Sequence, residues 1–181
     1  MAAQPQFQLH KLYIKDASFQ IPEGSVIFQN EWAPELNVEV NTQATKLNEQ
    51  NTFEVALKIK ATVKSSNKLA FEAEVQQAGI FEITDLPKEQ LENALGAYCP
   101  NLLYPYLREA ISDLVTRGGF PQLSLAPINF EMLYQQQRQN GGEFFVNGAE
   151  PTAERSAKTA PATEEKKLKK TAATAKTKKK K

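Results

Sequence analysis

Residues 52–64, which read TFEVALKIKATVK, alternate between apolar and polar side chains, with Ala56 as the one exception. Successive side chains of a β-strand point to opposite faces, so this alternation places the apolar side chains together on one face. The pattern predicts a strand with one buried face and one solvated face. Its apolar members are Phe53, Val55, Leu57, Ile59, Ala61 and Val63.

Three further stretches are extended in character. Residues 36–41 and 69–76 repeat the same alternation, whereas residues 7–21 carry apolar side chains on both faces. Clusters of Pro, Gly, Asn and Ser separate the four runs, and these residue types favour turns. Four strands joined by short turns predict an antiparallel sheet.

The second half of the chain changes to a helical period. Apolar residues recur at helical spacing over residues 103–115, which predicts an amphipathic helix. Gly118 and Gly119 are expected to end this helix, with Arg117 in its last turn. Pro105 is expected in the first turn, where its missing N–H matters least.

Shorter elements flank this long helix. Asn129 is the predicted N-cap of a second, short helix that continues into a Gln-rich stretch. Residues 120–127 contain two prolines and are expected to form an extended connector, and residues 85–95 are a further candidate helix. Strands followed by helices predict an α+β fold: a four-stranded antiparallel sheet packed with one long and one short helix.

Charge divides the chain into two regions. Residues 151–181 carry 11 Lys and Arg against 3 Glu, a net charge of +8, whereas residues 1–150 carry 11 against 18 acidic residues, a net charge of −7. The Lys-rich end has no periodic apolar pattern, so it cannot bury enough surface to offset the entropy of ordering. We therefore expect one folded domain over residues 1–145 and a disordered tail over residues 146–181.

Residues able to carry enzyme chemistry are scarce. The chain has one cysteine, Cys99, and one histidine, His10, which is too few for a structural zinc site of the usual composition. No Gly-rich phosphate loop is present either. The sequence predicts a binding protein without metal or cofactor. Cys99 and His10 acting as nucleophile and base remain the enzymatic alternative.

The N-terminus lacks the cationic start and apolar run of a signal peptide. No segment approaches the roughly 20 apolar residues that span a bilayer. These features predict a cytoplasmic protein that does not insert into membranes.

Several motifs resemble those of the SecB protein-export chaperones. They occur in order and with similar spacing between residues 7 and 137, and the YCPN and GFPQLSLAP motifs are highly specific. The matching stretches are YIKDASF at 13–19, FQNEWAP at 28–34, EVQQAGIF at 74–81, LGAYCPNLLYPY at 95–106 and RGGFPQLSLAPINF at 117–130.

The resemblance implies a cytosolic holdase that keeps unfolded preproteins competent for translocation and delivers them to the SecA motor. It also implies a homotetramer, a dimer of dimers with the long helices between two sheets. The apolar arc of the long helix is wider than one small sheet needs, which is consistent with a second packing partner. The interface residues expected on this helix are Leu103, Tyr106, Leu107, Ala110 and Leu114.

The resemblance further implies a client groove formed by the crossover segment, the second strand and the short helix. Exposed apolar and aromatic side chains suit a site that binds many unrelated unfolded chains. The alternative is that these side chains simply fill the core. The residues carried over are Phe28, Trp32, Leu36, Val38, Val40, Phe130, Leu133 and Tyr134.

A second site is implied on an acidic sheet surface that receives the basic C-terminal segment of SecA. Asp16 and Glu74 match family positions there, and Glu72 shares a strand face with Glu74. Gln20 stands where the family typically has Glu, and Glu72 stands where an apolar residue is more usual. The alternative is an ordinary solvated strand face.

Other functions remain open at this point. The Lys-rich tail departs from the family pattern and suits contact with the acidic body, nucleic acid, ribosomes or anionic lipid, or no partner at all. A SecB-like chaperone that serves a toxin–antitoxin system would have the same fold.

Overall fold

The computed structural model describes residues 6–29, 31–48, 51–139 and 146–148. The chain divides into two units, Met1–Glu150 and Pro151–Lys181, and the described residues all belong to the first. The expected disordered tail lies outside the described residues from position 149 onward. Its first three residues, which we expected to be irregular, form a short strand instead.

Four long antiparallel strands make up the sheet, as the alternating pattern predicted. Their spatial order is β1-β4-β3-β2, which places β4 and β3 between β1 and β2. A fifth strand, β5 (Val146–Gly148), pairs in parallel with the end of β2. The long strands are β1 (Gln6–Gln20), β2 (Pro34–Lys46), β3 (Thr52–Ser65) and β4 (Lys68–Thr84).

Two β-bulges in β1 explain why its apolar residues fell on both faces of an ideal strand. The register with β4 shifts between Leu9 and Lys11 and again between Ile14 and Asp16. Each bulge inserts one extra residue and so reverses the alternation. As a result the apolar side chains of β1 stay on one side of the sheet, opposite odd-numbered residues of β4; they are Phe7, Leu9, Leu12, Ile14, Ala17 and Phe19.

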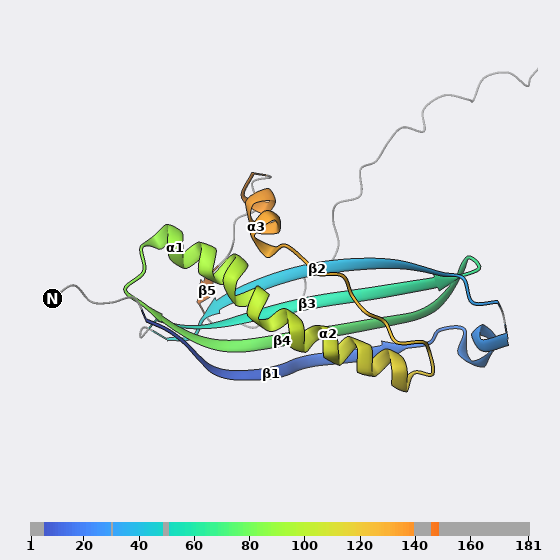
Figure 1. The fold of residues 1–181 in the computed structure, drawn as a ribbon. Helices are drawn as coiled ribbons and strands as arrows, with labels where there is room; N and C mark the ends of the chain where they lie inside the picture. Colours follow the sequence, from blue (N-terminus) through green and yellow to red (C-terminus); the bar gives the residue numbers. More distant parts are fainter. Residues whose placement is uncertain (1–5, 30, 49–50, 140–145, 149–181) are drawn as a thin grey trace, which may run out of the picture. The chain divides into compact units, whose positions relative to one another are not determined.

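A long helical stretch covers this apolar side of the sheet (Figure 1). It consists of α1 (Lys88–Asn93), a π-helical turn η2 (Ala94–Tyr98) and α2 (Cys99–Arg117). The candidate helix at residues 85–95 and the long helix predicted over residues 103–115 are therefore parts of one continuous element. Because it begins at residue 88, Pro105 lies inside α2 and not in a first turn, as we had expected.

The core lies between this helical stretch and the sheet. Side chains of α2 pack mainly against β4 and β3. The predicted apolar face of β3 is buried there, including Leu57 and Ile59, which have no exposed surface. At a rough 25 cal/mol per Å² of apolar area, burial of each large aliphatic side chain contributes about 1.5–3 kcal/mol.

After α2 the chain returns across the same side of the sheet as a connector without helix or strand, in the segment where we expected an extended connector, and then forms α3 (Phe130–Gln139) (Figure 1). The Oδ1 atom of Asn129 accepts a hydrogen bond from the backbone N–H of Met132 at 3.1 Å, which confirms the predicted N-cap. Within the described residues, no helix is long and apolar enough to cross a membrane.

Candidate functional site

An aromatic wall stands beside the start of β2. Phe28, in the 3₁₀ turn η1 (Gly24–Gln29), is 52% exposed, and Trp32, in the following loop, is 38% exposed. Both rings pack on buried Phe120, with centroid separations of 4.9 Å for Phe28 and 5.4 Å for Trp32. Each ring therefore packs on Phe120 with one side and is exposed to solvent on the other.

The backbone on either side of Trp32 is fixed by one buried hydroxyl. The N–H of Ala33 donates to Oγ of Ser65 at 3.0 Å, and that hydroxyl donates to the carbonyl of Glu31 at 3.2 Å. Ser65 lies at the end of β3 and is almost completely buried. Trp32 thus projects from a loop that is anchored on the sheet.

The apolar face of β2 continues this wall. Leu36, Val38 and Val40 are opposite inward-facing residues of β3, so they lie on the same side of the sheet as α2. The long helix packs mainly on the other strands, and Leu36 remains 45% exposed while both valines are half-buried. These three residues form the floor of an apolar strip that begins at Trp32.

The short helix contributes less open surface than its sequence suggested. Phe130 and Tyr134 are buried, whereas Leu133 is half-buried. The ring of Phe130 meets that of Tyr104 edge-on at 5.4 Å. Phe130 and Tyr134 therefore attach α3 to the long helix, and among the three predicted residues of α3 only Leu133 is partly accessible.

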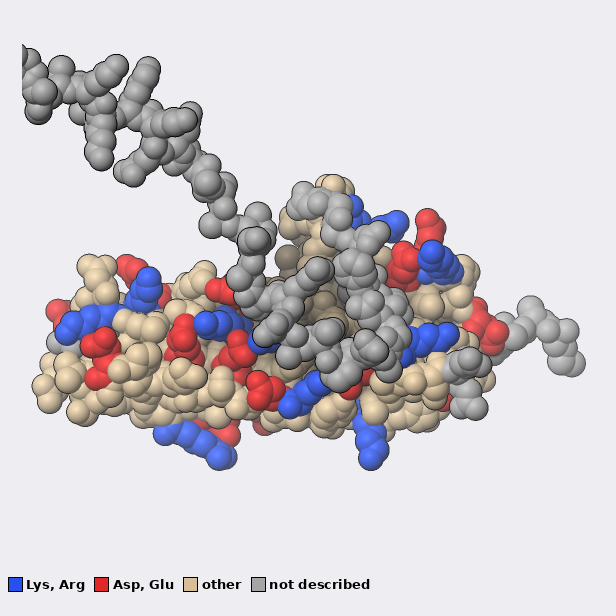
Figure 2. Space-filling model, turned by 180° about the vertical axis from the view of Figure 1, so that it is seen from behind, with Lys and Arg blue, Asp and Glu red and all other residues tan. Residues whose placement is uncertain are grey.

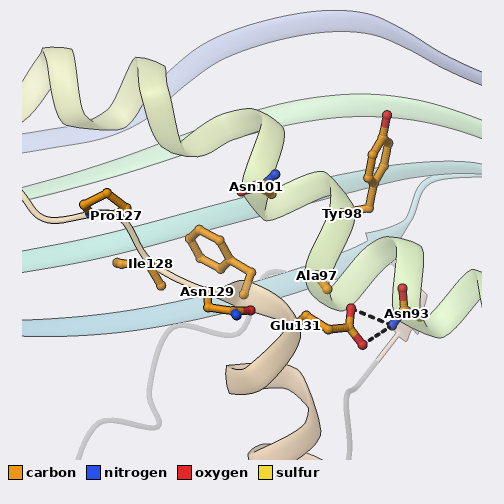
Figure 3. Close-up of a pocket in the computed structure, with 9 residues that line it drawn as sticks. Asn93, Ala97, Tyr98, Asn101, Pro127, Ile128, Asn129 and Glu131 are labelled. Atoms are coloured by element: carbon orange, nitrogen blue, oxygen red, sulfur yellow. Dashed lines mark hydrogen bonds between the residues drawn. The ribbon is translucent and has the colours of Figure 1, made fainter.

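Polar contacts support the same attachment. Nδ2 of Asn93, in α1, lies 2.9 Å from each carboxylate oxygen of Glu131, at the start of α3 (Figure 3). These residues line an open pocket of about 500 Å³, together with Asn101 and Asn129. The pocket lies at the junction of α3 with the long helical stretch (Figure 3).

The eight predicted groove residues thus divide by exposure. Three are exposed, three are half-buried, and two serve the subunit's own packing. Sequence reasoning missed Phe120, which follows the glycine pair at the end of α2, and Met132, which is 56% exposed on α3. We refer to the surface of Phe28, Trp32, Leu36, Val38, Val40 and Leu133 as the candidate client groove, or client groove for short.

The predicted acidic residues lie on the opposite, uncovered face of the sheet. Asp16 is opposite Gln76 in the register, and Glu72 and Glu74 alternate with buried residues of β4. Both glutamates form ion pairs across to β3: Nζ of Lys58 lies 2.8 Å from Glu74, and Nζ of Lys60 lies 2.9 Å from Glu72. The hydrogen bond to Glu72 raises the pKa of Lys60.

The sheet face is consequently mixed in charge and not simply acidic. Lys and Arg side chains are interspersed with Asp and Glu on the side of the sheet away from α2 (Figure 2). Within the described residues, no ion pair of Asp16, Glu35 or Glu39 is found. Of these, Glu39 lies opposite Lys60 in the register and its charge helps to raise the pKa of Lys60. Asp16 and Glu35 are therefore the acidic groups on this face that retain the most freedom to meet a cationic partner.

A three-residue network lies on the same face. The hydroxyl of Tyr13 donates to Glu54 at 2.6 Å, and Lys15 forms an ion pair with the same carboxylate. Burial and the hydrogen bond to Glu54 raise the pKa of Tyr13 to about 12. Burial alone would raise the pKa of Glu54, but the hydrogen bonds from Lys15 and Tyr13 outweigh it and lower that pKa. Tyr13 therefore stays protonated at neutral pH.

The predicted interface residues of α2 also divide by exposure. Leu103 and Leu107 have no exposed surface and pack in the core of the chain itself, so neither side chain is accessible to a second chain. Tyr106 is 50% exposed, and Ala110 and Leu114 are half-buried. Of the five residues predicted for an interface, these last three are the ones whose side chains remain at least partly accessible on α2.

Cys99 and His10 do not form a catalytic pair. Cys99 is buried, and burial raises the pKa of its thiol. Nε2 of His10 lies 2.7 Å from Glu82, on the face of the sheet away from α2. Among the described residues, no group of three or more His, Cys, Asp and Glu side chains is placed to hold a metal ion.

Comparison with known proteins agrees with this fold. The family model described as preprotein translocase subunit SecB matches residues 1–141. Protein-export protein SecB 1 of Francisella tularensis subsp. novicida is 49% identical over 141 residues, 78% of this chain and 95% of that protein. Protein-export protein SecB of Psychrobacter arcticus is 50% identical over 137 residues, 76% of this chain and 91% of that protein.

A solved structure is also similar in fold. It is a SecB-like chaperone of Mycobacterium tuberculosis in complex with a ChAD peptide from the antitoxin HigA1. The TM-score is 0.54 at 17% sequence identity, over 67% of this chain and 90% of that one. At this identity the likeness establishes the shared fold.

The sheet, the overlying helix and these relatives define a chaperone of protein export. The chain belongs to the SecB family.

Proposed function

We propose that this chaperone is a cytoplasmic holdase that binds unfolded preproteins in the client groove and delivers them to SecA. The observation that carries the proposal is the position of Phe28 and Trp32: two aromatic rings exposed at their outer surfaces yet fixed from beneath by Phe120. Large exposed apolar patches on soluble proteins mark binding sites. Rigid aromatic side chains lose little entropy on binding and dominate interface energies.

Selection for unfolded chains follows from this surface without a recognition sequence. A folded protein hides its apolar segments, so it offers the groove nothing to bind. An unfolded precursor presents many such segments, and each can meet the aromatic wall or the floor of β2. The binding needs neither nucleotide nor other cofactor, because burial of apolar surface supplies its free energy.

We propose a homotetramer, with Tyr106, Ala110 and Leu114 contributing to contacts between subunits. Several grooves on one assembly can hold successive segments of one client. Linking weak sites in this way raises the overall affinity by about 10²–10⁴ without any new contact. Weak individual contacts also allow stepwise release to the motor.

The experiment that tests this function is a refolding assay. The protein should slow refolding of a denatured secretory precursor when present in stoichiometric amounts, and it should not bind the same precursor once folded. A variant lacking residues 151–181 should act like the full chain, because the groove lies in the first unit. Loss of activity with the tail would contradict the proposal and point to a function carried by the basic segment.

The uncovered sheet face is the proposed docking surface for a basic segment of SecA. Electrostatic attraction of this kind accelerates association and weakens with added salt. Here Lys58 and Lys60 already neutralise Glu74 and Glu72, so a basic peptide must compete with these internal partners. Asp16 contributes without such competition among the described residues.

Removing an internal competitor should therefore strengthen docking. We expect Lys58→Gln to lower the dissociation constant of a Lys-rich peptide about two- to fivefold at low ionic strength, since exposed ion pairs are worth about 0.2–1 kcal/mol. The effect should fade as salt screens the surface. Isothermal titration calorimetry at two salt concentrations measures both quantities.

Lys64→Gln is the matched control. Lys64 is exposed on the same strand, but no ion pair joins it to Glu72 or Glu74. Its removal changes the net charge equally without freeing either carboxylate, so the gain should be smaller. Equal gains from the two variants would show that net charge alone controls docking, and no gain from Lys58→Gln would place the docking surface elsewhere.

A further inference from the structure

Phe120 lies at the centre of an aromatic cluster that joins the groove to the core. Its ring centroid is 4.7 Å from that of Phe71 and 6.4 Å from that of Phe19, both on the sheet. On its other side it meets Phe28 and Trp32, the exposed pair. Phe120 itself is only 6% exposed, so it contributes almost no surface of its own to a client.

The end of α2 determines where this ring points. The N–H of Phe120 donates to the carbonyl of Val115 at 3.3 Å, and the N–H of Gly119 donates to that of Thr116 at 3.1 Å. Gly119 has a φ of +86°. This combination is a Schellman motif, in which a residue in the left-handed region ends the helix and the next residue turns back toward it.

The neighbouring glycine fits the same arrangement. A Cβ atom at Gly118 would overlap the ring of Phe19, so only glycine allows the helix end to approach β1 so closely. A Cβ atom at Gly119 would lie 3.6 Å from Cε1 of Phe28, which shows how near the cap lies to the groove. The helix end, the sheet and the aromatic wall thus meet within one small region.

From this geometry we propose that Phe120 is a positioning residue for client binding. It holds the rings of Phe28 and Trp32 in place and is itself held by the Schellman motif at the end of α2. The inference rests on the proposed holdase function. It assigns binding strength to a side chain that a client does not touch: without the support of Phe120, the two exposed rings lose their common platform and must be ordered anew by each client.

The test is Phe120→Leu, which keeps the site apolar but removes the flat ring. Trp32 is the sole tryptophan of the chain, so its emission reports on this one position. We expect the emission of the free variant to shift to longer wavelength, because Trp32 becomes more solvated. We also expect affinity for an unfolded precursor to fall about five- to tenfold. Phe120→Met, which has no ring but is a flexible gap-filler, is the second variant if Phe120→Leu folds poorly.

Phe81→Leu is the matched control. Phe81 is buried in β4, and its ring packs near Phe7 and not near Trp32. Its replacement should lower the melting temperature to a similar extent while emission and client affinity stay as in the parent. A general loss of stability would affect both variants alike, whereas a positioning role affects only the variant at Phe120.

A double-mutant cycle separates this inference from the proposed function. If Phe120 acts through Trp32, Phe120→Leu should weaken binding much less in a Trp32→Ala background than in the parent chain. The positioning role would be overturned if the affinity losses of the two single variants multiplied fully in the double variant. Unchanged Trp32 emission in Phe120→Leu would overturn it as well. Parent-like affinity of Trp32→Ala would instead refute the groove, and the emission of the free Phe120→Leu variant would still decide the positioning question.

Discussion

Replacing Phe28 and Trp32 together by alanine is expected to weaken capture of an unfolded precursor about a hundredfold. Truncation of a single aromatic hot-spot residue costs about 2 kcal/mol or more, and such losses are not additive for neighbouring residues. For two rings that share one support we therefore expect about 2.7 kcal/mol in total, which corresponds to the hundredfold loss. Both rings are exposed in the free protein, so the substitutions remove binding surface without opening a hole in the core. The loss should be concentrated in the dissociation rate, as is usual for apolar contacts.

Competition with a fluorescent unfolded precursor measures this loss, and the mass of the assembly should remain that of the parent. Tyr98→Ala is the control, because Tyr98 is about as exposed as Phe28 and more exposed than Trp32. It packs edge-on against Phe7, whose strand end is remote from Trp32 in the sheet register. Parent-like capture by the double variant would remove both rings from the binding site. A similar loss in Tyr98→Ala would show that any exposed aromatic ring suffices.

Gly96→Ala is expected to detach α3 and to weaken client binding about tenfold. A Cβ atom at this position would lie 2.6 Å from Cε2 of Tyr134, whose ring is buried. Gly96 lies in the π-helical turn η2, which brings the long helical stretch close to α3. Alanine gains up to about 1 kcal/mol of helix propensity over glycine. Overpacking of a buried ring costs about 1–3 kcal/mol, so the clash should prevail.

Hydrogen exchange over residues 130–139 measures this detachment, and a binding titration measures its consequence for clients. Ala97→Gly is the control: it lies in the same turn, is also buried, and costs about 1 kcal/mol of helix stability without adding an atom. Exchange in α3 should rise in Gly96→Ala and stay near the parent value in Ala97→Gly. Equal protection of α3 in both variants would contradict the account of this junction.

Much of the fold could be predicted because single residues report on local geometry. The alternation in residues 52–64 identifies β3, whose observed bounds are Thr52–Ser65. Asn129 marks the start of α3, and Gly118 with Gly119 marks the end of α2, because caps and left-handed turns have strong residue preferences. The resemblance to the SecB family came from motifs between residues 13 and 130, and the family model that matches residues 1–141 confirms it.

The features that escaped prediction depend on which residues meet across the fold. The pairing of Lys58 with Glu74 depends on strand register, so an apparently acidic face was expected where the charges are balanced. A helical arc does not distinguish a subunit's own sheet from a neighbouring subunit, and Leu103 was therefore assigned to an interface although it is buried in the core. The support that Phe120 gives to Trp32 joins positions far apart in the sequence.

In the proposed function, fixed and exposed aromatic rings bind a chain only while that chain is unfolded. The emission of Trp32 tests it most directly, in a titration with one secretory precursor held either unfolded or folded. We predict a saturable shift to shorter wavelength with the unfolded form, as a client covers the ring, and no change with the folded form. If the unfolded precursor binds while the emission of Trp32 stays constant, or if both forms shift it equally, the claim is wrong.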